Sequence, residues 1–158
     1  MKKEIDNTVE LISFQSKLAP IFAQLNYEWL EEFFVVEPHD EEMLDSPYEY
    51  IIQPGGHIFF ALHLNEIVGT VALINEGSGV FELAKMAVTK QHRGKGIGKK
   101  LIQKAIEHCS TIDCQLLYLM SNSKLKPAIH LYEQYGFSHT SMCETPYNRC
   151  DVRMEKTF

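Results

Sequence analysis

The sequence predicts an α/β (α+β) fold, with about four helices flanking a mixed, mostly antiparallel sheet of six to seven strands. Residues 80–88 are apolar and β-favouring, and they lead through a glycine-rich turn into an amphipathic helix. Residues 57–62 and 67–74 are two strand patterns joined by a tight turn near Asn65, which indicates a hairpin. A strand at 115–121 follows across the helical connection, so we expect it to lie parallel to the strand at 80–88.

The N-terminal third is expected to hold one strand and two helices. Residues 8–14 alternate in the manner of a strand, and Ser16 caps a helix that continues to Leu30. Pro38 should end or kink the chain that follows. A second short helix is expected at about 40–51, and the Pro-Gly-Gly sequence after it should break it.

The C-terminal third should complete the sheet. A helix is expected to open at Lys126, with Pro127 near its first turn and Gly136 as its C-terminal cap. Residues 137–143 and 152–156 are then expected to close the sheet as antiparallel strands.

Length and composition indicate one globular domain. With 158 residues and 45% hydrophobic content, residues 1–158 are expected to build a single domain with its own core. The charged start and the lack of an apolar run of about 20 residues predict a soluble, cytoplasmic protein. No metal is expected, because the seven histidines are scattered and Cys-x-x-Cys spacing is missing from the four cysteines, Cys109, Cys114, Cys143 and Cys150.

The net charge of −6 is distributed unevenly. No Lys or Arg occurs between Lys17 and Lys85, acids crowd residues 28–49, and bases surround the glycine-rich turn. A basic half suits a polyanionic cofactor and an acidic half suits a cationic amine, although the acids could equally form a solvated helix face. The overall acidity argues against nucleic acid as a partner.

The glycine-rich turn is the first candidate binding element. Gly94, Gly96 and Gly98 carry no Cβ, so the backbone can turn tightly and approach a ligand closely. The unpaired N–H groups of the following helix, with Arg93 and Lys95, would bind a phosphate or pyrophosphate. Dinucleotide and nucleoside-triphosphate sites also use such turns, but the chain lacks both an early βαβ unit and a closing Lys-Ser or Lys-Thr pair.

Two segments resemble motifs of one family. The run Gln91-His92-Arg93-Gly94-Lys95-Gly96 resembles the Gln/Arg-x-x-Gly-x-Gly/Ala signature of the GNAT-superfamily N-acetyltransferases. The segment from Asn122 to Phe137 is similar to the family's Asn...Ala-x-x-Leu-Tyr-x-x-x-Gly-Phe block. The two blocks occur in the family's order, and the resemblance covers roughly residues 57–144.

This resemblance implies a GNAT-like fold whose central parallel strands splay apart to hold acetyl-CoA. Residues 1–56 would then supply a strand and the acceptor-side helices, and residues 57–158 the sheet and the acetyl-CoA-binding core. Asn122 would bond to the cofactor or serve as a turn residue, and Lys124 and Lys126 would touch its phosphates or remain surface lysines. The implied cofactor-binding residues are Met86, Ala87, Val88, Gln91, His92, Arg93, Gly94, Lys95, Gly96, Ile97, Gly98, Lys99, Asn122 and Ala128.

Two residues are candidates for proton transfer. Tyr132 matches the family's tyrosine that protonates the CoA sulfur, although it could simply pack with neighbouring helix residues. Glu82 interrupts an apolar strand, where an idle buried carboxylate would be costly, and it matches a base position of the family. Strand alternation would put it on the face of Ala84 and Met86. The other interpretation of Glu82 is that it merely pairs with Lys85 or His57.

The resemblance implies acetyl transfer from acetyl-CoA to a primary amine of a small molecule or peptide. Direct attack in a ternary complex is expected, because no cysteine occupies a motif position suited to a relay. The alternatives are a non-catalytic acyl-CoA sensor and an ATP-using enzyme. We expect no membrane partner and leave a homodimer open. Acceptor contacts, or simply core positions, are expected among Tyr27, Trp29, Glu31, Phe33, Phe34 and Tyr48.

Overall fold

A computed structural model describes residues 8–142 and 144–158. These residues form a seven-stranded sheet in the order β1-β2-β3-β4-β5-β7-β6. Neighbouring strands are antiparallel except β4 and β5, which run parallel, so the predicted mixed, mostly antiparallel sheet is confirmed. The strands are β1 (Val9–Ser13), β2 (His57–His63), β3 (Glu66–Gly77), β4 (Val80–Val88), β5 (Leu116–Ser121), β6 (Ser138–Thr140) and β7 (Val152–Thr157).

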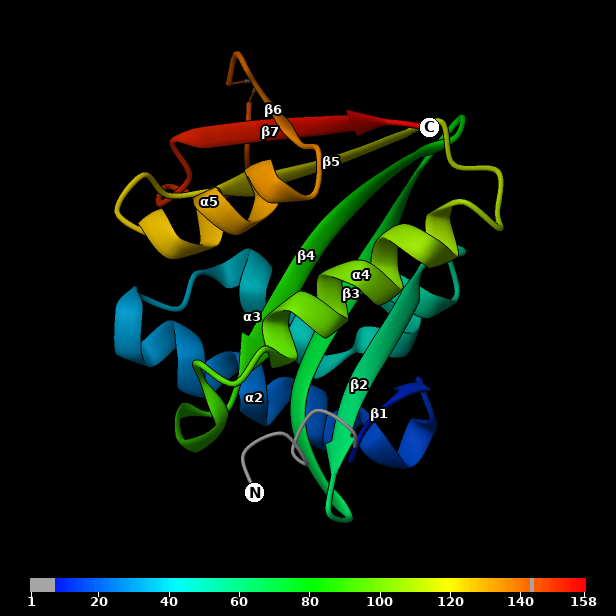
Figure 1. The fold of residues 1–158 in the computed structure, drawn as a ribbon, viewed down its shortest axis with the longest axis vertical. Helices are drawn as coiled ribbons and strands as arrows, with labels where there is room; N and C mark the ends of the chain where they lie inside the picture. Colours follow the sequence, from blue (N-terminus) through cyan, green and yellow to red (C-terminus); the bar gives the residue numbers. More distant parts are fainter. Residues whose placement is uncertain (1–7, 143) are drawn as a thin grey trace.

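Four α-helices of the described chain flank this sheet (Figure 1). One core cluster joins α4 to the sheet through Ile97, Leu101 and Ala105. The second joins the opposite face to the N-terminal helices through residues such as Phe22 and Leu44. The helices are α2 (Ala19–Phe33), α3 (Pro38–Asp45), α4 (Ile97–Cys109) and α5 (Lys126–Gln134), with shorter helical turns at Ser16–Leu18, Tyr48–Ile52 and Lys90–His92.

The N-terminal helices begin at other residues than predicted. Ser16 lies in a 3₁₀ turn and does not cap the helix, because α2 begins at Ala19 with Pro20 in its first turn. Pro38 opens α3 instead of ending a helix, since proline has no N–H to lose at the first helical position. The predicted helix at about 40–51 is split near Pro47, which cannot donate a helical hydrogen bond.

The predicted hairpin and the predicted C-terminal elements are confirmed. Leu64 and Asn65 both have positive φ, 49° and 65°, as a two-residue hairpin turn requires. Gly136, with φ 91°, follows the last turn of α5 as expected for a C-terminal cap. The strand predicted at 137–143 is shorter and ends at Thr140, and its predicted end, Cys143, lies outside the described residues.

Two features are absent from the described residues. None of the helices in 8–142 and 144–158 is long and apolar enough to cross a membrane. Within the same ranges, no three side chains of His, Cys, Asp or Glu gather as ligands of a metal ion would.

Candidate active site

The parallel strands β4 and β5 separate along their length. Their pairing is limited to Val80–Glu82 against Leu116–Tyr118. Beyond this point β4 continues beside β3, and β5 continues beside β7. Figure 1 shows the two strands meeting at one end and diverging toward the other. The divergence leaves a gap in the middle of the sheet.

A β-bulge in β4 accompanies the gap. The register between β3 and β4 shifts by one residue, so Lys85 and Met86 together face Val71. Lys85 has φ 53°, a left-handed conformation that residues with a side chain seldom adopt. A bulge bends a strand and increases its twist. The bend therefore helps to turn the second half of β4 away from β5.

A cavity of about 610 Å³ lies at this gap. Met86 and Tyr132 line it from the α4 face of the sheet, and Trp29 and Ala84 line it from the face covered by α2 and α3. The cavity therefore connects the two faces through the opening between β4 and β5. Other residues around it include Asn26, Leu30, Phe34, Met120, Ser121, Leu125, Leu131 and Gln134.

The ladder of β3 and β4 determines which peptide groups point into the gap. The Thr89 amide donates to the Val68 carbonyl at 2.9 Å, so the facing residues Gly69 and Val88 are a non-hydrogen-bonded pair. The N–H of Val88 consequently points away from β3, toward the gap. The same alternation directs the peptide groups of Ala87 to β3, so Ala87 lines the cavity without offering a free backbone partner.

The glycine-rich turn presents the start of α4 to the cavity. Gly96 is the N-terminal cap residue, with φ 83° and no side-chain capping bond. Gly94, Gly96 and Gly98 all line the cavity, and a Cβ at Gly94 or Gly98 would meet no protein atom within 4 Å. The first N–H groups of a helix have no intrahelical partner and attract anions through the helix dipole. The open space and the donors fit a diphosphate.

Arg93 fixes the shape of this turn. Its Nε donates to the Val88 carbonyl at 3.0 Å, and its Nη1 donates to Glu32 at 2.8 Å. Its Nη2 is buried and has no acceptor among the described residues. A buried donor without a partner is costly, and a phosphate oxygen would satisfy it.

Most of the predicted cofactor contacts surround this single cavity. Gln91 and Lys95 are the exceptions, since both are exposed and neither lines it. Lys124 also lies outside the lining and instead donates to the Phe33 carbonyl at 3.0 Å. Those predicted residues that do line the cavity are Met86, Ala87, Val88, His92, Arg93, Gly94, Gly96, Ile97, Gly98, Lys99, Asn122 and Ala128.

Asn122 performs the turn role that the sequence left open. Its side-chain oxygen accepts from the Lys124 amide at 2.9 Å, and its Nδ2 donates to the Arg149 carbonyl at 2.6 Å. The side chain thus ties the end of β5 to the loop before β7.

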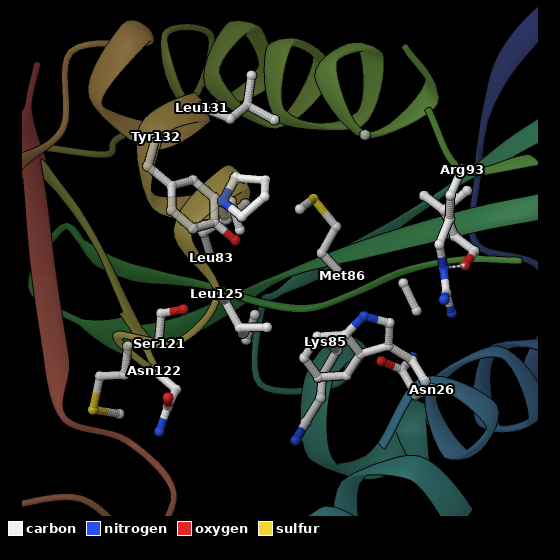
Figure 2. A pocket seen from close by; sticks show the side chains of 18 of the residues that line it. Asn26, Leu83, Lys85, Met86, Arg93, Ser121, Asn122, Leu125, Leu131 and Tyr132 are labelled. Atoms are coloured by element: carbon white, nitrogen blue, oxygen red, sulfur yellow. Dashed lines mark hydrogen bonds between the residues drawn. The ribbon is translucent and has the colours of Figure 1, made fainter. Parts of the chain in front are cut away.

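Tyr132 extends from α5 into the cavity (Figure 2). Its ring packs edge-on against Phe137, with centroids 6.0 Å apart. Burial raises the pKa of the Tyr132 hydroxyl to about 12. The group therefore stays protonated at neutral pH and can donate its proton to an atom that gains negative charge.

Glu82 is a buried carboxylate in the cavity wall, with 9% exposure. Burial raises its pKa to about 7, the nearby Glu76 adds to the effect, and Lys85 opposes it. At this pKa the carboxyl group exchanges a proton near neutral pH, as a general base must. The competing expectation of a bridge to Lys85 does not describe the structure, because the Lys85 ammonium bonds to Asp40 and Tyr147 instead.

The bulge changes which face each β4 side chain occupies. Ala84 packs with the cluster of α2 and α3, whereas Met86 packs with the cluster of α4. The expected shared face of Ala84 and Met86 is therefore wrong, because two bulged residues interrupt the alternation. Figure 2 shows Lys85 and Met86 leaving the strand in opposite directions.

The sequence reading missed a group of buried charges beside Glu82. Asp40 is completely buried and accepts from Lys85 at 2.8 Å and from both terminal nitrogens of Arg149 at 2.7 and 2.8 Å. Burial alone would raise the Asp40 pKa, but these bonds and charges lower it to about 2. A lone lysine in the apolar strand β4 was the available signal for Lys85. Nothing in its own loop pointed to Arg149.

The acidic segment lies elsewhere than the amine-binding expectation required. None of its carboxylates lines the cavity: seven are exposed, Asp40 is buried behind the cavity wall, and Glu37 is half-buried and bonded to Arg149. The solvated-face reading therefore describes most of these acids. Of the candidate acceptor contacts, Trp29 and Phe34 line the cavity, whereas Tyr27, Glu31, Phe33 and Tyr48 do not.

One cysteine, Cys150, also lines the cavity. Burial raises the pKa of its thiol, so the reactive thiolate is scarce at neutral pH. Cys109 and Cys114 are buried in the core.

The chain belongs to the GNAT acetyltransferase family, because residues 23–137 match the Acetyltransferase (GNAT) family. It is 35% identical over 116 residues to the uncharacterized N-acetyltransferase YjgM of Escherichia coli (strain K12), which covers 70% of each chain. It is 36% identical over 110 residues to the N-acetylaspartate synthetase of Xenopus tropicalis. That match covers 65% of this chain and only 38% of the Xenopus protein.

Solved structures share the fold at low sequence identity. A GNAT-family acetyltransferase from Staphylococcus aureus Mu50 superposes with a TM-score of 0.85 and 22% identity, over 94% of this chain and 98% of that one. The structure of yncA, a putative acetyltransferase from Salmonella typhimurium with its cofactor acetyl-CoA, gives a TM-score of 0.76 and 16% identity. It covers 96% of this chain and 94% of that one.

Proposed function

We propose that this chain is an N-acetyltransferase that moves the acetyl group of acetyl-CoA to a primary amine of a small molecule or peptide. One observation carries the proposal: a single cavity joins the N-terminal amides of α4 on one face of the sheet to the buried carboxylate of Glu82 on the other. Membership of the family and a structural neighbour with acetyl-CoA support the choice of donor.

The α4 face is the donor side. The N–H groups at the start of α4 and the unpaired Nη2 of Arg93 hold the diphosphate, while Lys99 adds positive charge at the cavity edge. The thioester then lies in the gap, where the free N–H of Val88 donates to its carbonyl oxygen. Such a donor stabilises the charge that develops on this oxygen during attack.

In the proposed reaction, Glu82 accepts a proton from the amine and Tyr132 donates a proton to the departing sulfur. The ammonium group loses one proton to Glu82, directly or through a water molecule, and the neutral nitrogen forms a bond with the acetyl carbon. As the intermediate collapses, this nitrogen releases its second proton to solvent, and Glu82 returns its own proton to solvent. The bond between this carbon and sulfur breaks, and the electron pair leaves with the sulfur. Tyr132 gives its hydroxyl proton to this thiolate and recovers a proton from solvent. Attack is direct, since the raised pKa of Cys150 disfavours an acetylated cysteine.

Two measurements on the wild-type protein test this function. Isothermal titration should show acetyl-CoA binding, and thiol release should follow when polyamines, aminoglycosides, amino acids or peptides with free N-termini are added. Binding without thiol release across the whole panel would contradict catalysis and favour an acyl-CoA-binding module. The vertebrate relative is named for N-acetylaspartate, so amino acids belong in the panel.

A further inference from the structure

The wall of the cavity next to Glu82 carries two positive charges. Lys85 and Arg149 both line the cavity, and their side chains are only 6% and 16% exposed. The acids that pair with them, Asp40 and Glu37, do not line it. Glu82 is thus the one carboxylate that this side of the cavity presents among the described residues. This wall therefore presents two cationic groups and one carboxylate to the cavity, while the acids paired with the cations lie behind it.

Asp40 holds both cations in place without using all their donors. Arg149 donates both hydrogens of Nη1 and one hydrogen of Nη2 to the carboxylates of Asp40 and Glu37. The Lys85 ammonium group donates two of its three hydrogens, one to Asp40 and one to the Tyr147 hydroxyl. The Nε–H of Arg149, its second Nη2 hydrogen and the third Lys85 hydrogen have no acceptor within the described part of the chain. These donors remain available to a ligand.

The two cations and Glu82 belong to one small region. The charges of Arg149, Lys85 and Glu82 all act on the pKa of the same thiol, Cys150, which itself lines the cavity. The Tyr147 ring helps to hold this arrangement, because Arg149 stacks on it with its guanidinium carbon 4.3 Å from the ring centre. One negative and two positive side chains therefore line the same part of the cavity.

We infer that the acceptor is an amino acid whose free carboxylate lies close to its amine. Its ammonium group faces Glu82, and its carboxylate receives hydrogen bonds from the free donors of Arg149 and Lys85. Such charge-assisted bonds are stronger than neutral ones and discriminate against ligands that cannot form them. The inference rests on the proposed acetyl transfer and adds the class of acceptor.

The first test compares matched acceptors on the wild-type protein. Each L-amino acid is assayed beside its own amide, which keeps the amine and side chain but lacks the negative charge. Release of CoA thiol should be at least about tenfold more efficient, as kcat/KM, for the preferred amino acid than for its amide. Equal efficiencies, or a preference for polyamines, would overturn the acceptor class while leaving acetyl transfer intact. If no amine is acetylated, the proposed function fails and the acceptor class fails with it.

A second test places the carboxylate contact on Arg149. Arg149→Lys keeps the positive charge but loses the planar fork, so the preference for the amino acid over its amide should fall about tenfold. Because this ratio compares two acceptors on one enzyme preparation, partial unfolding does not affect it. Titration with acetyl-CoA should give the wild-type affinity. Lys17→Gln, at an exposed position in the Ser16–Leu18 turn, is the matched control and should keep the wild-type ratio. An unchanged ratio in Arg149→Lys would contradict the contact.

Discussion

At the residue scale, burial raises the pKa of both Tyr132 and Glu82, the two residues to which the proposed reaction assigns opposite proton transfers. The same effect raises the pKa of both groups, to about 12 for the phenol and about 7 for the carboxyl. The phenol therefore stays protonated at neutral pH and is available to donate its proton to the sulfur as negative charge develops there. The carboxyl group releases and takes protons near neutral pH. One physical cause thus yields a donor and an acceptor in one cavity.

Removing the Tyr132 hydroxyl should slow the chemical step. We expect Tyr132→Phe to lower kcat by about 10²- to 10⁴-fold, because the thiolate would leave without a positioned proton donor. Acetyl-CoA affinity should stay nearly the same, since the ring is retained. Steady-state thiol release and titration calorimetry measure the two quantities. Tyr135→Phe, one residue after α5, is the control, and wild-type turnover in Tyr132→Phe would remove the acid role.

Replacing the Glu82 carboxylate should change the pH dependence of the rate. Wild-type kcat/KM should rise as pH increases through about 7, because the carboxylate form accepts the amine proton. Glu82→Gln should be slower, with the largest deficit above pH 7, where the wild-type carboxylate is ionised and can accept the amine proton, and with little deficit below it, where the wild-type carboxyl group is itself neutral. The test is kcat/KM of both proteins measured from pH 6 to 9. A pH profile of Glu82→Gln identical to that of the wild type would count against Glu82 as the base.

The same substitution should alter stability with a defined sign. The folded pKa of Glu82, about 7, exceeds its ordinary value of 4.5, so the folded state keeps a proton that the unfolded state has lost between these values. Its contribution to the unfolding free energy is therefore greatest below pH 4.5 and falls by about 3 kcal/mol as pH rises to 7. Urea unfolding of Glu82→Gln from pH 5 to 8 should lack this decline. Glu66→Gln, at the exposed first residue of β3, should keep it.

At the scale of elements, Asp40 connects α3 to β4 and to the loop before β7. Breaking a buried ion pair leaves the other charges without partners. We expect Asp40→Asn to lower the unfolding free energy by about 3–5 kcal/mol in urea titrations at pH 7. Glu41→Gln, its exposed neighbour on α3, should change the unfolding free energy little. Equal stability of the two variants would contradict the structural role of the cluster.

Low pH should weaken the ion pairs that Asp40 forms with Lys85 and Arg149. The pKa of Asp40 is lowered to about 2 from its ordinary 3.8, so its stabilisation is complete above 3.8 and is lost as pH falls toward 2.

The elements that the sequence predicted are those defined by local patterns. The strand, glycine turn and helix at 80–109 follow one another along the chain, so hydrophobic periodicity and glycine spacing suffice to place them. The β4 bulge depends on pairing with β3, and the contact of Asp40 with Arg149 spans 109 residues. Neither leaves a local pattern. Sequence reasoning therefore reached the residues around the start of α4 and missed most of the buried charges beside Glu82.

At the scale of the whole molecule, the gap between β4 and β5 opens one cavity to both faces of the sheet. One core cluster supports the α4 face and the other supports the face of α2 and α3, and the cavity crosses the sheet between them. In the proposed reaction, donor and acceptor enter from opposite faces of the sheet and meet in the gap. This arrangement permits direct attack in a ternary complex, because neither substrate blocks the other's path.

The most direct test is a crystal of this protein soaked with acetyl-CoA, because its structure would show where the cofactor binds. We expect the diphosphate to lie within hydrogen-bonding distance of the amides between Gly94 and Lys99, with the thioester oxygen near the N–H of Val88. A diphosphate bound away from the start of α4, or a gap without the thioester at saturating acetyl-CoA, would contradict it.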